Sequence, residues 1–216
     1  MLSTKIDEIK QLIEYGAPRE YQRDALALLE IYENDIIALN LFHNFYSFLP
    51  EGLDDSITEL KLVIRKEGVF LICAVSTINE YLYLVNQERA EFIGLFSEGI
   101  FDEEVLDFLG YSRKEEADKL FITSEKYPQY SSACENETLC PICAAAVGEY
   151  HTFGCPVEVC PWCGGQLTSC NCRFTILGKE HLSTENDLKL LKKQIHEKGR
   201  IAYDPVDQRP TYPGTG

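Results

Sequence analysis

Residues 140–172 read CPICAAAVGEYHTFGCPVEVCPWCGGQLTSCNC and contain seven of the nine cysteines of the chain. Two Cys-Pro-x-Cys pairs stand within this stretch, Cys140/Cys143 and Cys160/Cys163, with sixteen residues between them. Two pairs of thiolates at such a spacing are typical of a tetrahedral zinc site. We therefore expect Cys140, Cys143, Cys160 and Cys163 to bind one zinc ion in a closed site of the structural type.

Four further donors lie between and after these pairs: His151, Cys155, Cys170 and Cys172. If the two Cys-Pro-x-Cys pairs share one metal, these four can share a second, which is a cross-braced arrangement. The alternative is sequential, so that each pair shares a metal with the two donors that follow it. We favour the cross-brace because it joins like with like. Against a second metal, His151 can be a surface histidine, and one residue between Cys170 and Cys172 is a tight gap.

Three further residues have other expected roles. Cys73 lies in an apolar segment and is expected to be a core thiol. Cys134 is expected to be a free thiol of a linker, with replacement of a missing ligand as the alternative. Trp162, inside the second pair, is a candidate contact for a partner; packing against the adjoining strand is its alternative.

The run His-x-x-Gly-Cys…Cys-Pro-x-Cys-Gly-Gly-Gln…Ser-Cys-x-Cys resembles a zinc-ribbon-like, cysteine-rich C-terminal module of uncharacterised bacterial proteins. The second Cys-Pro-x-Cys pair also resembles a rubredoxin turn, although the spacing between the pairs is short for a rubredoxin-like iron site. The resemblance covers residues 138–203 and leaves the N-terminal part unmatched. It implies metal binding at the matched positions and implies no reaction.

Before this stretch, the pattern of apolar residues predicts helices and then strands. Apolar residues recur at helical spacing over 3–15, 18–32 and 35–48, and the last of these is apolar nearly all round, as in a core helix. Asn34 can cap that helix. The next segment allows a helix that starts with a capping box at Ser56 and Glu59. It also allows a strand, which we favour because Leu60, Leu62 and Ile64 alternate with Lys61, Val63 and Arg65 at the period of a strand.

Three more strands are expected at 69–76, 80–87 and 91–96, which completes a four-stranded antiparallel meander. Two short helices follow, the second at 112–122 with a capping box at Ser112 and Glu115. The fold class is therefore α+β. After the cysteine-rich stretch we expect a short strand at 173–177 and a helix at 184–198, capped by Thr184 and Asp187 and ended by Gly199. The predicted domain limits are an α+β domain at 1–127, a linker at 128–139, a zinc module at 140–203 and an extended tail at 204–216.

The acidic residues of the chain are concentrated in its N-terminal part. The net charge is −15 over 216 residues, and residues 1–133 carry 12 basic and 25 acidic residues. A chain of this charge is repelled by nucleic-acid phosphates unless a basic patch is segregated. The basic candidates are Lys189, Lys192, Lys193, Lys198 and Arg200, which we interpret as a solvated helix face.

No stretch of about 18 apolar residues predicts a membrane span. The N-terminal segment resembles an amphipathic helix rather than a signal peptide, so a cytoplasmic location is expected, and there clustered cysteines favour metal over disulfides. Catalytic motifs are absent from the sequence, and His43 is expected to be a satisfied core histidine. We expect a non-enzymatic zinc-binding protein that contacts a basic protein, in the manner of an inhibitor or immunity protein. The alternatives are nucleic-acid binding and a metal-dependent enzyme or accessory subunit; a small-molecule substrate is not expected.

Overall fold

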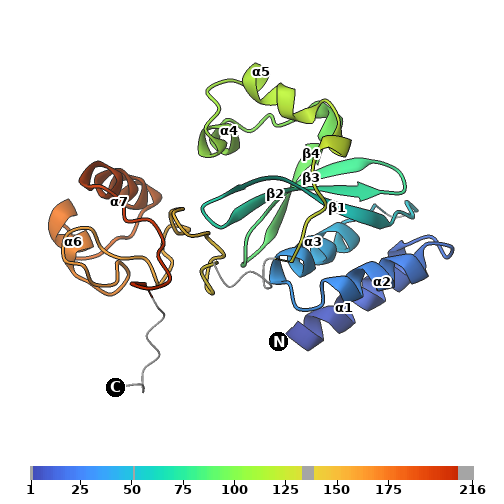
Figure 1. Cartoon of the computed structure of the whole chain (residues 1–216), viewed down its shortest axis with the longest axis horizontal. Coiled ribbons are helices and arrows are strands. Elements are labelled where there is room, and N and C mark those ends of the chain that lie inside the picture. The colour runs from blue at the N-terminus through green and yellow to red at the C-terminus, as the bar shows by residue number, and fades with distance from the viewer. Residues whose placement is uncertain (1, 51, 133–138, 209–216) are drawn as a thin grey trace. The chain divides into compact units, whose positions relative to one another are not determined.

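The computed structural model describes residues 2–50, 52–132 and 139–208 (Figure 1). The chain divides into two compact units, Met1–Asn136 and Glu137–Gly216, which are called here the N-terminal and the C-terminal unit. Over these described residues, the N-terminal unit combines helices with a single antiparallel sheet, and the C-terminal unit holds the cysteine-rich stretch and two helices. The predicted α+β class is therefore confirmed.

Three helices open the N-terminal unit: α1 (Leu2–Gly16), α2 (Gln22–Ile31) and α3 (Ile36–Ser47). Helix α3 is buried on most of its surface, as its sequence predicted. Asp35, and not Asn34, caps it, because the Asp35 carboxylate accepts hydrogen bonds from the backbone of Ile37 at 2.8 Å and Ala38 at 3.2 Å. Asp35 is itself buried, so these bonds also satisfy a carboxylate that water does not reach.

The sheet is a meander with strand order β1-β2-β3-β4. Its strands are β1 (Ile57–Lys66), β2 (Val69–Ser76), β3 (Glu80–Val85) and β4 (Ala90–Leu95). The choice of a strand over a helix for the first of them is confirmed. Glu67 and Gly68 both have positive φ, 51° and 73°, and form a two-residue hairpin turn whose twist suits the paired strands.

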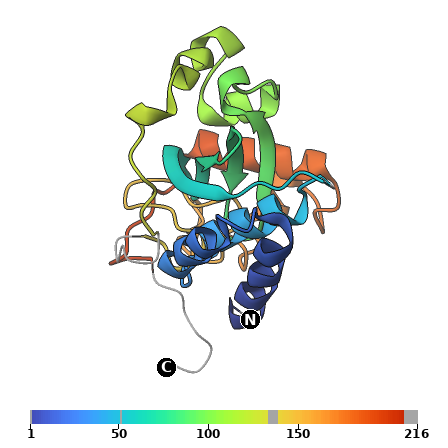
Figure 2. The same cartoon turned by 90° about the vertical axis from the view of Figure 1, so that its right-hand side faces the viewer.

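Helices cover both faces of this sheet. The views in Figures 1 and 2 agree that α1–α3 lie on one face, while α4 (Glu103–Leu109) and α5 (Lys114–Ala117) lie on the other. Strand β2 is therefore buried on both sides, as predicted: Leu71 and Cys73 pack against the α4 side, and the ring of Phe70 contacts Tyr130 on the opposite face. Short 3-10 turns join this part of the chain at η1 (Phe96–Glu98), η2 (Asp118–Phe121) and η3 (Ser124–Lys126). The capping box expected at Ser112 does not form, because α5 begins at Lys114 without a side-chain cap.

One edge of the sheet is covered by the segment that follows the helices. The backbone of Leu62 donates to Pro128 at 3.0 Å, and Tyr130 donates to Leu60 at 2.7 Å. The Tyr130 hydroxyl also donates to the buried Asp35 carboxylate at 2.9 Å. Residues 128–130, which we expected in a linker, are thus part of the N-terminal unit.

The C-terminal unit contains α6 (Cys172–Leu177) and α7 (Glu185–Lys198). Residues 173–177 are helical, so the strand expected there was wrong; Gly178, with a φ of 63°, ends α6 in the left-handed conformation. Helix α7 has the predicted capping box of Thr184 and Asp187 and ends at Gly199. Within the described ranges, the structure contains no helix that is both long and apolar enough to cross a bilayer.

Candidate metal centres

Eight donor side chains of the C-terminal unit form two sets of four, and in each set the donor atoms lie within 4.8 Å of one another. The first centre consists of Cys140, Cys143, His151 and Cys155, and the second of Cys160, Cys163, Cys170 and Cys172. The structure thus brings together all eight predicted donors, but in the sequential grouping. The cross-braced grouping that we favoured is not formed, because each Cys-Pro-x-Cys turn meets the donors that directly follow it.

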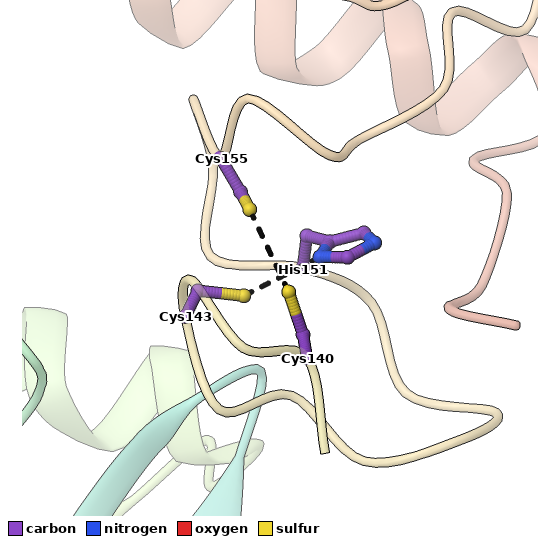
Figure 3. A group of neighbouring side chains, drawn as sticks. All are labelled: Cys140, Cys143, His151 and Cys155. Atoms are coloured by element: carbon purple, nitrogen blue, oxygen red, sulfur yellow. Dashed lines mark hydrogen bonds between the residues drawn. The ribbon is translucent and has the colours of Figure 1, made fainter. Parts of the chain in front are cut away.

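The four donors of the first centre converge on one point (Figure 3). The sulfurs of Cys140 and Cys155 are 3.9 Å apart, and the Cys143 sulfur is 3.3 Å from Nδ1 of His151. A tetrahedral zinc ion with Zn–S bonds of about 2.3 Å separates its sulfurs by about 3.8 Å. A disulfide requires an S–S distance of about 2.05 Å. The spacing therefore fits a tetrahedral ion and excludes a bond between Cys140 and Cys155.

A tight turn presents the first two thiols. The backbone N–H of Cys140 donates to Ala145 at 2.7 Å, and that of Ala144 donates to Cys140 at 2.8 Å. These two hydrogen bonds close the turn around the sulfurs and place Ala144 in the left-handed region, with a φ of 58°. Residues that are not glycine adopt this region at a cost, which the surrounding structure must offset.

The second Cys-Pro-x-Cys pair forms the same turn. Cys160 donates to Gly165 at 2.7 Å and Gly164 donates to Cys160 at 2.9 Å. Gly164 occupies the position of Ala144, with a φ of 71°, and here glycine takes the left-handed conformation without strain. The repeated geometry shows that the pattern of the sequence, a pair followed by a small residue, specifies this turn.

His151 is enclosed by the end of the described chain. Its side chain is fully buried, so it is not the surface histidine of our alternative interpretation. Its Nε2 lies 2.9 Å from Oε1 of Gln208, and the Gln208 amide donates to the backbone of Ala202 at 2.9 Å. Because the amide group of Gln208 is committed as a donor, its oxygen accepts from Nε2–H, and Nδ1 is left to bind a metal.

Gln208 lies in the segment that we expected to be an extended tail, and no motif of the sequence predicted its role. The residue is buried in the structure, and the backbone N–H of Gln208 donates to Asp204 at 2.9 Å in a local turn. Asp204 also accepts from the backbone of Val206 at 2.8 Å, as expected of an aspartate that opens a turn. That turn-forming aspartate was the available signal that the chain folds back here.

The second centre is more open to solvent than the first. Cys160 is buried, Cys170 and Cys172 are half-buried and Cys163 is exposed, whereas all four donors of the first centre are buried. Cys172 is the first residue of α6, and Cys170 lies in the turn that leads to it. This change of chain direction lets two cysteines with only one residue between them face the same point.

In both centres the ionisation of one thiol depends on its neighbours. The Cys143 thiol, which is hydrogen-bonded to Cys140, is the main group that lowers the pKa of Cys140, to about 3. The contact with Cys140 in turn raises the pKa of Cys155 above its ordinary value. In the second centre, the backbone N–H of Gly165 is the main group that lowers the pKa of Cys163. A bound cation removes the competition between the thiols, because it stabilises every thiolate at once.

A buried ion pair lies between the two centres. Arg200 donates from Nε to the Glu158 carboxylate at 2.6 Å and from a second nitrogen to the backbone oxygen of His151. Glu158 is fully buried, and its backbone oxygen accepts from Leu167 at 2.8 Å. We expected Arg200 to belong to a solvated basic face, and this was wrong. The side chain of Arg200 is buried and connects the loop of the first centre to the turn of the second.

Among the described residues, the others to which we assigned a role from the sequence are not donors of either centre. Trp162 is half-buried and packs against a cluster that includes Cys160 and Leu191, so a packing role accounts for it. Cys73 is a core thiol as predicted, and burial raises its pKa to about 12. His43 is not a core histidine: its side chain is 34% exposed and lies 3.4 Å from Glu8. Cys134 lies outside the described residues.

These observations define an α+β protein whose C-terminal unit holds two sets of donors able to bind metal, which is consistent with a zinc-binding module. Comparisons with models of protein families, with curated proteins and with solved structures find no match to this chain. Function is therefore inferred from the residues of the molecule alone.

Proposed function

We propose that this chain is a non-enzymatic protein that binds two structural zinc ions and acts by contacting a basic protein. The observation that carries the zinc assignment is the presence of two sets of four donors within 4.8 Å, seven of them thiols and one an imidazole. Thiolate and imidazole are the donors of structural zinc sites, and four of them complete its tetrahedral coordination.

The completeness of both sets is the reason for a non-enzymatic role. A catalytic zinc keeps one position for water or substrate, whereas each set here supplies four protein donors. In the first centre all four are buried, so a substrate has no direct approach to the metal. The zinc ions would then supply folding energy to the C-terminal unit, which suits a protein of the reducing cytoplasm.

Support for a basic partner comes from charge. Residues 1–133 carry 12 basic and 25 acidic residues, a net charge of −13. Such a field attracts cationic surfaces, accelerates their association and disfavours other acidic partners. An inhibitor-like or immunity-like role toward a basic protein would suit this field.

Nucleic-acid binding is less well supported, because several basic side chains of the C-terminal unit have acidic partners. Lys189 lies 3.1 Å from Glu185, and Lys193 lies 3.8 Å from Glu197. Arg200 is engaged with Glu158. The helix α7 therefore presents a face of mixed charge rather than a continuous basic stripe.

Metal analysis of the purified chain tests the zinc assignment. We expect two zinc ions per chain by elemental analysis, and one after Cys143→Ala or after Cys163→Ala. The variant Cys73→Ala is the control and should retain two. A content of one zinc in the unmodified chain, or of two in either single-centre variant, would contradict the assignment.

Recovery of partners tests the second half of the proposal. The chain, immobilised, should retain a basic protein from a cell extract at low salt and release it as the ionic strength rises, since exposed charges are screened. An extract that yields only the bait contradicts the partner assignment. A labelled RNA or DNA that binds tightly at low salt would instead support the nucleic-acid alternative.

A further inference from the structure

The two edges of the sheet differ in how they are covered. The β1 edge pairs with residues 128–130 through an isolated bridge of Lys61 with Gln129. Strand β4 lies at the opposite end of the strand order, and its one neighbour among the described strands is β3. An edge strand presents unpaired backbone groups that can pair with another chain.

The register of β4 identifies where such pairing can occur. Asn86 donates to Arg89 at 3.0 Å across the hairpin turn, so this pair is hydrogen-bonded. In an antiparallel ladder, bonded and non-bonded pairs alternate, so Phe92 directs its backbone N–H and C=O away from β3. The backbone oxygen of Ala90 has the same direction and accepts from the Asn44 side chain at 3.0 Å. The groups of Phe92 are thus the ones offered at this edge.

An aromatic cleft adjoins this position. It has a volume of about 520 Å³ and is lined by residues of α3, β3 and β4 and of the chain after α3. Phe45, Tyr81, Phe92 and Tyr83 form a chain of ring contacts in it, with centroid distances of 5.7, 6.1 and 5.6 Å. The side chains of Phe92 and Phe48 are 52% and 76% exposed. Large apolar surfaces of this kind on a folded chain mark binding sites.

The sequence of β4 does not protect the part of the edge beside the cleft. Natural edge strands are blunted by lysine, proline or bulges; residues 90–95, AEFIGL, contain no lysine or proline, and the irregularity of β4 comes only after Phe92. A register shift between β3 and β4 follows Phe92, so the regular part of the edge is the part beside the cleft. Glu91 is exposed at the cleft, and its contact with Arg89 at 3.4 Å is between two exposed side chains, which is a weak interaction.

We propose that β4 and the aromatic cleft bind an extended, basic segment of a partner protein as a fifth strand of the sheet. The backbone of the segment pairs with Phe92, an apolar side chain enters the cleft, and basic side chains face Glu91 and the acidic surface of the unit. Addition of a strand to an open edge, with pockets that read alternate side chains, is a recurring mode of peptide recognition. This inference rests on the proposed function only for the charge of the partner; the edge and the cleft are independent of it.

A synthetic peptide of alternating residues, Lys-Phe-Lys-Val-Lys-Phe with blocked ends, is the probe. We expect saturable binding to the full chain by fluorescence anisotropy of a labelled peptide. We also expect slower hydrogen exchange of the Phe92 amide in the unmodified chain when the peptide is bound. The same peptide with glutamate in place of lysine should bind more weakly, as should a version whose pairing amides are N-methylated. Equal binding of all three peptides, or unchanged exchange at Phe92, would overturn the proposal.

Matched variants locate the site. Phe92→Ser and Phe48→Ala should each weaken peptide binding about tenfold or more, as expected for central aromatic contacts. The controls are Ile78→Ser and Ile122→Ala, whose side chains are 47% and 78% exposed and do not line the cleft. Equal loss in the controls would show that exposed apolar surface in general, and not the cleft, binds the peptide. Because the exchange measurement uses the unmodified chain, the outcome does not depend on the folding of any variant.

The same variants separate this inference from the proposed function. If the unmodified chain retains a basic protein from an extract and Phe92→Ser retains it equally, the partner assignment stands and the cleft is not its site. If the chain retains no protein while the basic peptide binds at β4, the cleft stands and the partner assignment fails.

Discussion

The first and second centres begin with the same turn and close in different ways. In both, a Cys-Pro-x-Cys pair is held by two backbone hydrogen bonds of 2.7 to 2.9 Å, and a small residue takes the left-handed conformation. The first centre is then completed by His151 and Cys155, two buried donors from the loop that follows the turn. The second is completed by Cys170 and Cys172 at the start of α6, where the donors are half-buried.

This difference separates the residues that hold a metal from the residues that control the access of solvent to it. The turn supplies two thiols with similar backbone support in both centres, so donor geometry alone does not distinguish them. Gln208 and Tyr203 enclose the first centre: the Gln208 side chain hydrogen-bonds His151, and the ring centroid of Tyr203 lies 5.1 Å from that of His151. In the second centre Cys163 is exposed. We therefore expect the shared turns to contribute similarly to metal affinity in both centres, and the different closures to give different rates of metal release.

Removal of both metals should have the largest effect. Structural zinc contributes about 10–16 kcal/mol to the folding of small modules at neutral pH. Whole domains have a stability of about 5–15 kcal/mol. A chelator in excess should therefore unfold the C-terminal unit and leave the sheet of the N-terminal unit intact. Amide exchange resolved by residue checks this; retained protection at Leu191 and Ile195 after chelation would show that their packing does not need metal.

The rates of metal release should distinguish the centres. With a chromophoric chelator we expect two phases, the faster from the second centre because solvent reaches its exposed sulfur. The double variant Cys163→Ala, Cys172→Ala should lose the fast phase. The matched variant Cys143→Ala, Cys155→Ala should lose the slow one. Persistence of the fast phase in the first of these variants would contradict the assignment.

The sequence was sufficient to predict the donors but not their grouping. Two cysteines separated by two residues form a local turn, so Cys140/Cys143 and Cys160/Cys163 are constrained by short-range geometry. Which distant donors join each turn depends on the path of the chain after it, and spacing alone allows both paths. In the structure His151 is buried in the first centre and hydrogen-bonded to Gln208, which lies 57 residues away and is not signalled by the local spacing.

The same distinction applies to the fold. The alternation of apolar residues in β1 and the apolar run of β2 are local signals, so both strands could be predicted; in the structure β2 is buried over most of its length, whereas β1 is mostly half-buried. Residues 173–177 resemble a strand locally but form α6, because Cys172 faces the second centre and Gly178 ends a helical turn. Asp35 rather than Asn34 caps α3, and its carboxylate also accepts from the Tyr130 hydroxyl, a contact between residues 95 apart that the local sequence does not reveal.

Replacement of Gln208 should affect the first centre alone. Partners that orient a histidine ligand contribute about 10–100-fold to metal affinity. We expect Gln208→Ala to weaken zinc binding at the first centre by about this factor and to leave the second centre unchanged, as measured by competition with a chelator. Gln208→Glu keeps an acceptor for Nε2–H but loses the donor to the backbone oxygen of Ala202, so it should restore only part of the affinity. An equal loss at both centres would indicate a general loss of stability instead.

The smallest expected effect concerns the residue that differs between the two turns. At Gly164 an added Cβ meets no atom within 4 Å, so Gly164→Ala has only the backbone cost of the left-handed region, about 1–2 kcal/mol. Ala144→Gly relieves a similar cost, since its φ is 58°. It also removes a buried methyl group, which is worth about 0.8 kcal/mol, and adds freedom to the unfolded chain, which costs about 0.4–1 kcal/mol.

The two substitutions should therefore differ although the turns are alike. We expect Gly164→Ala to destabilise the zinc-loaded chain and Ala144→Gly to change its stability by less than about 0.5 kcal/mol, because its gains and losses cancel. Urea unfolding followed by fluorescence reports on the second turn directly, since Trp162 is the one tryptophan of the chain. Far-UV circular dichroism and metal content serve as controls. A clear gain in stability from Ala144→Gly would mean that the first turn is strained in a way that its metal, rather than its packing, offsets.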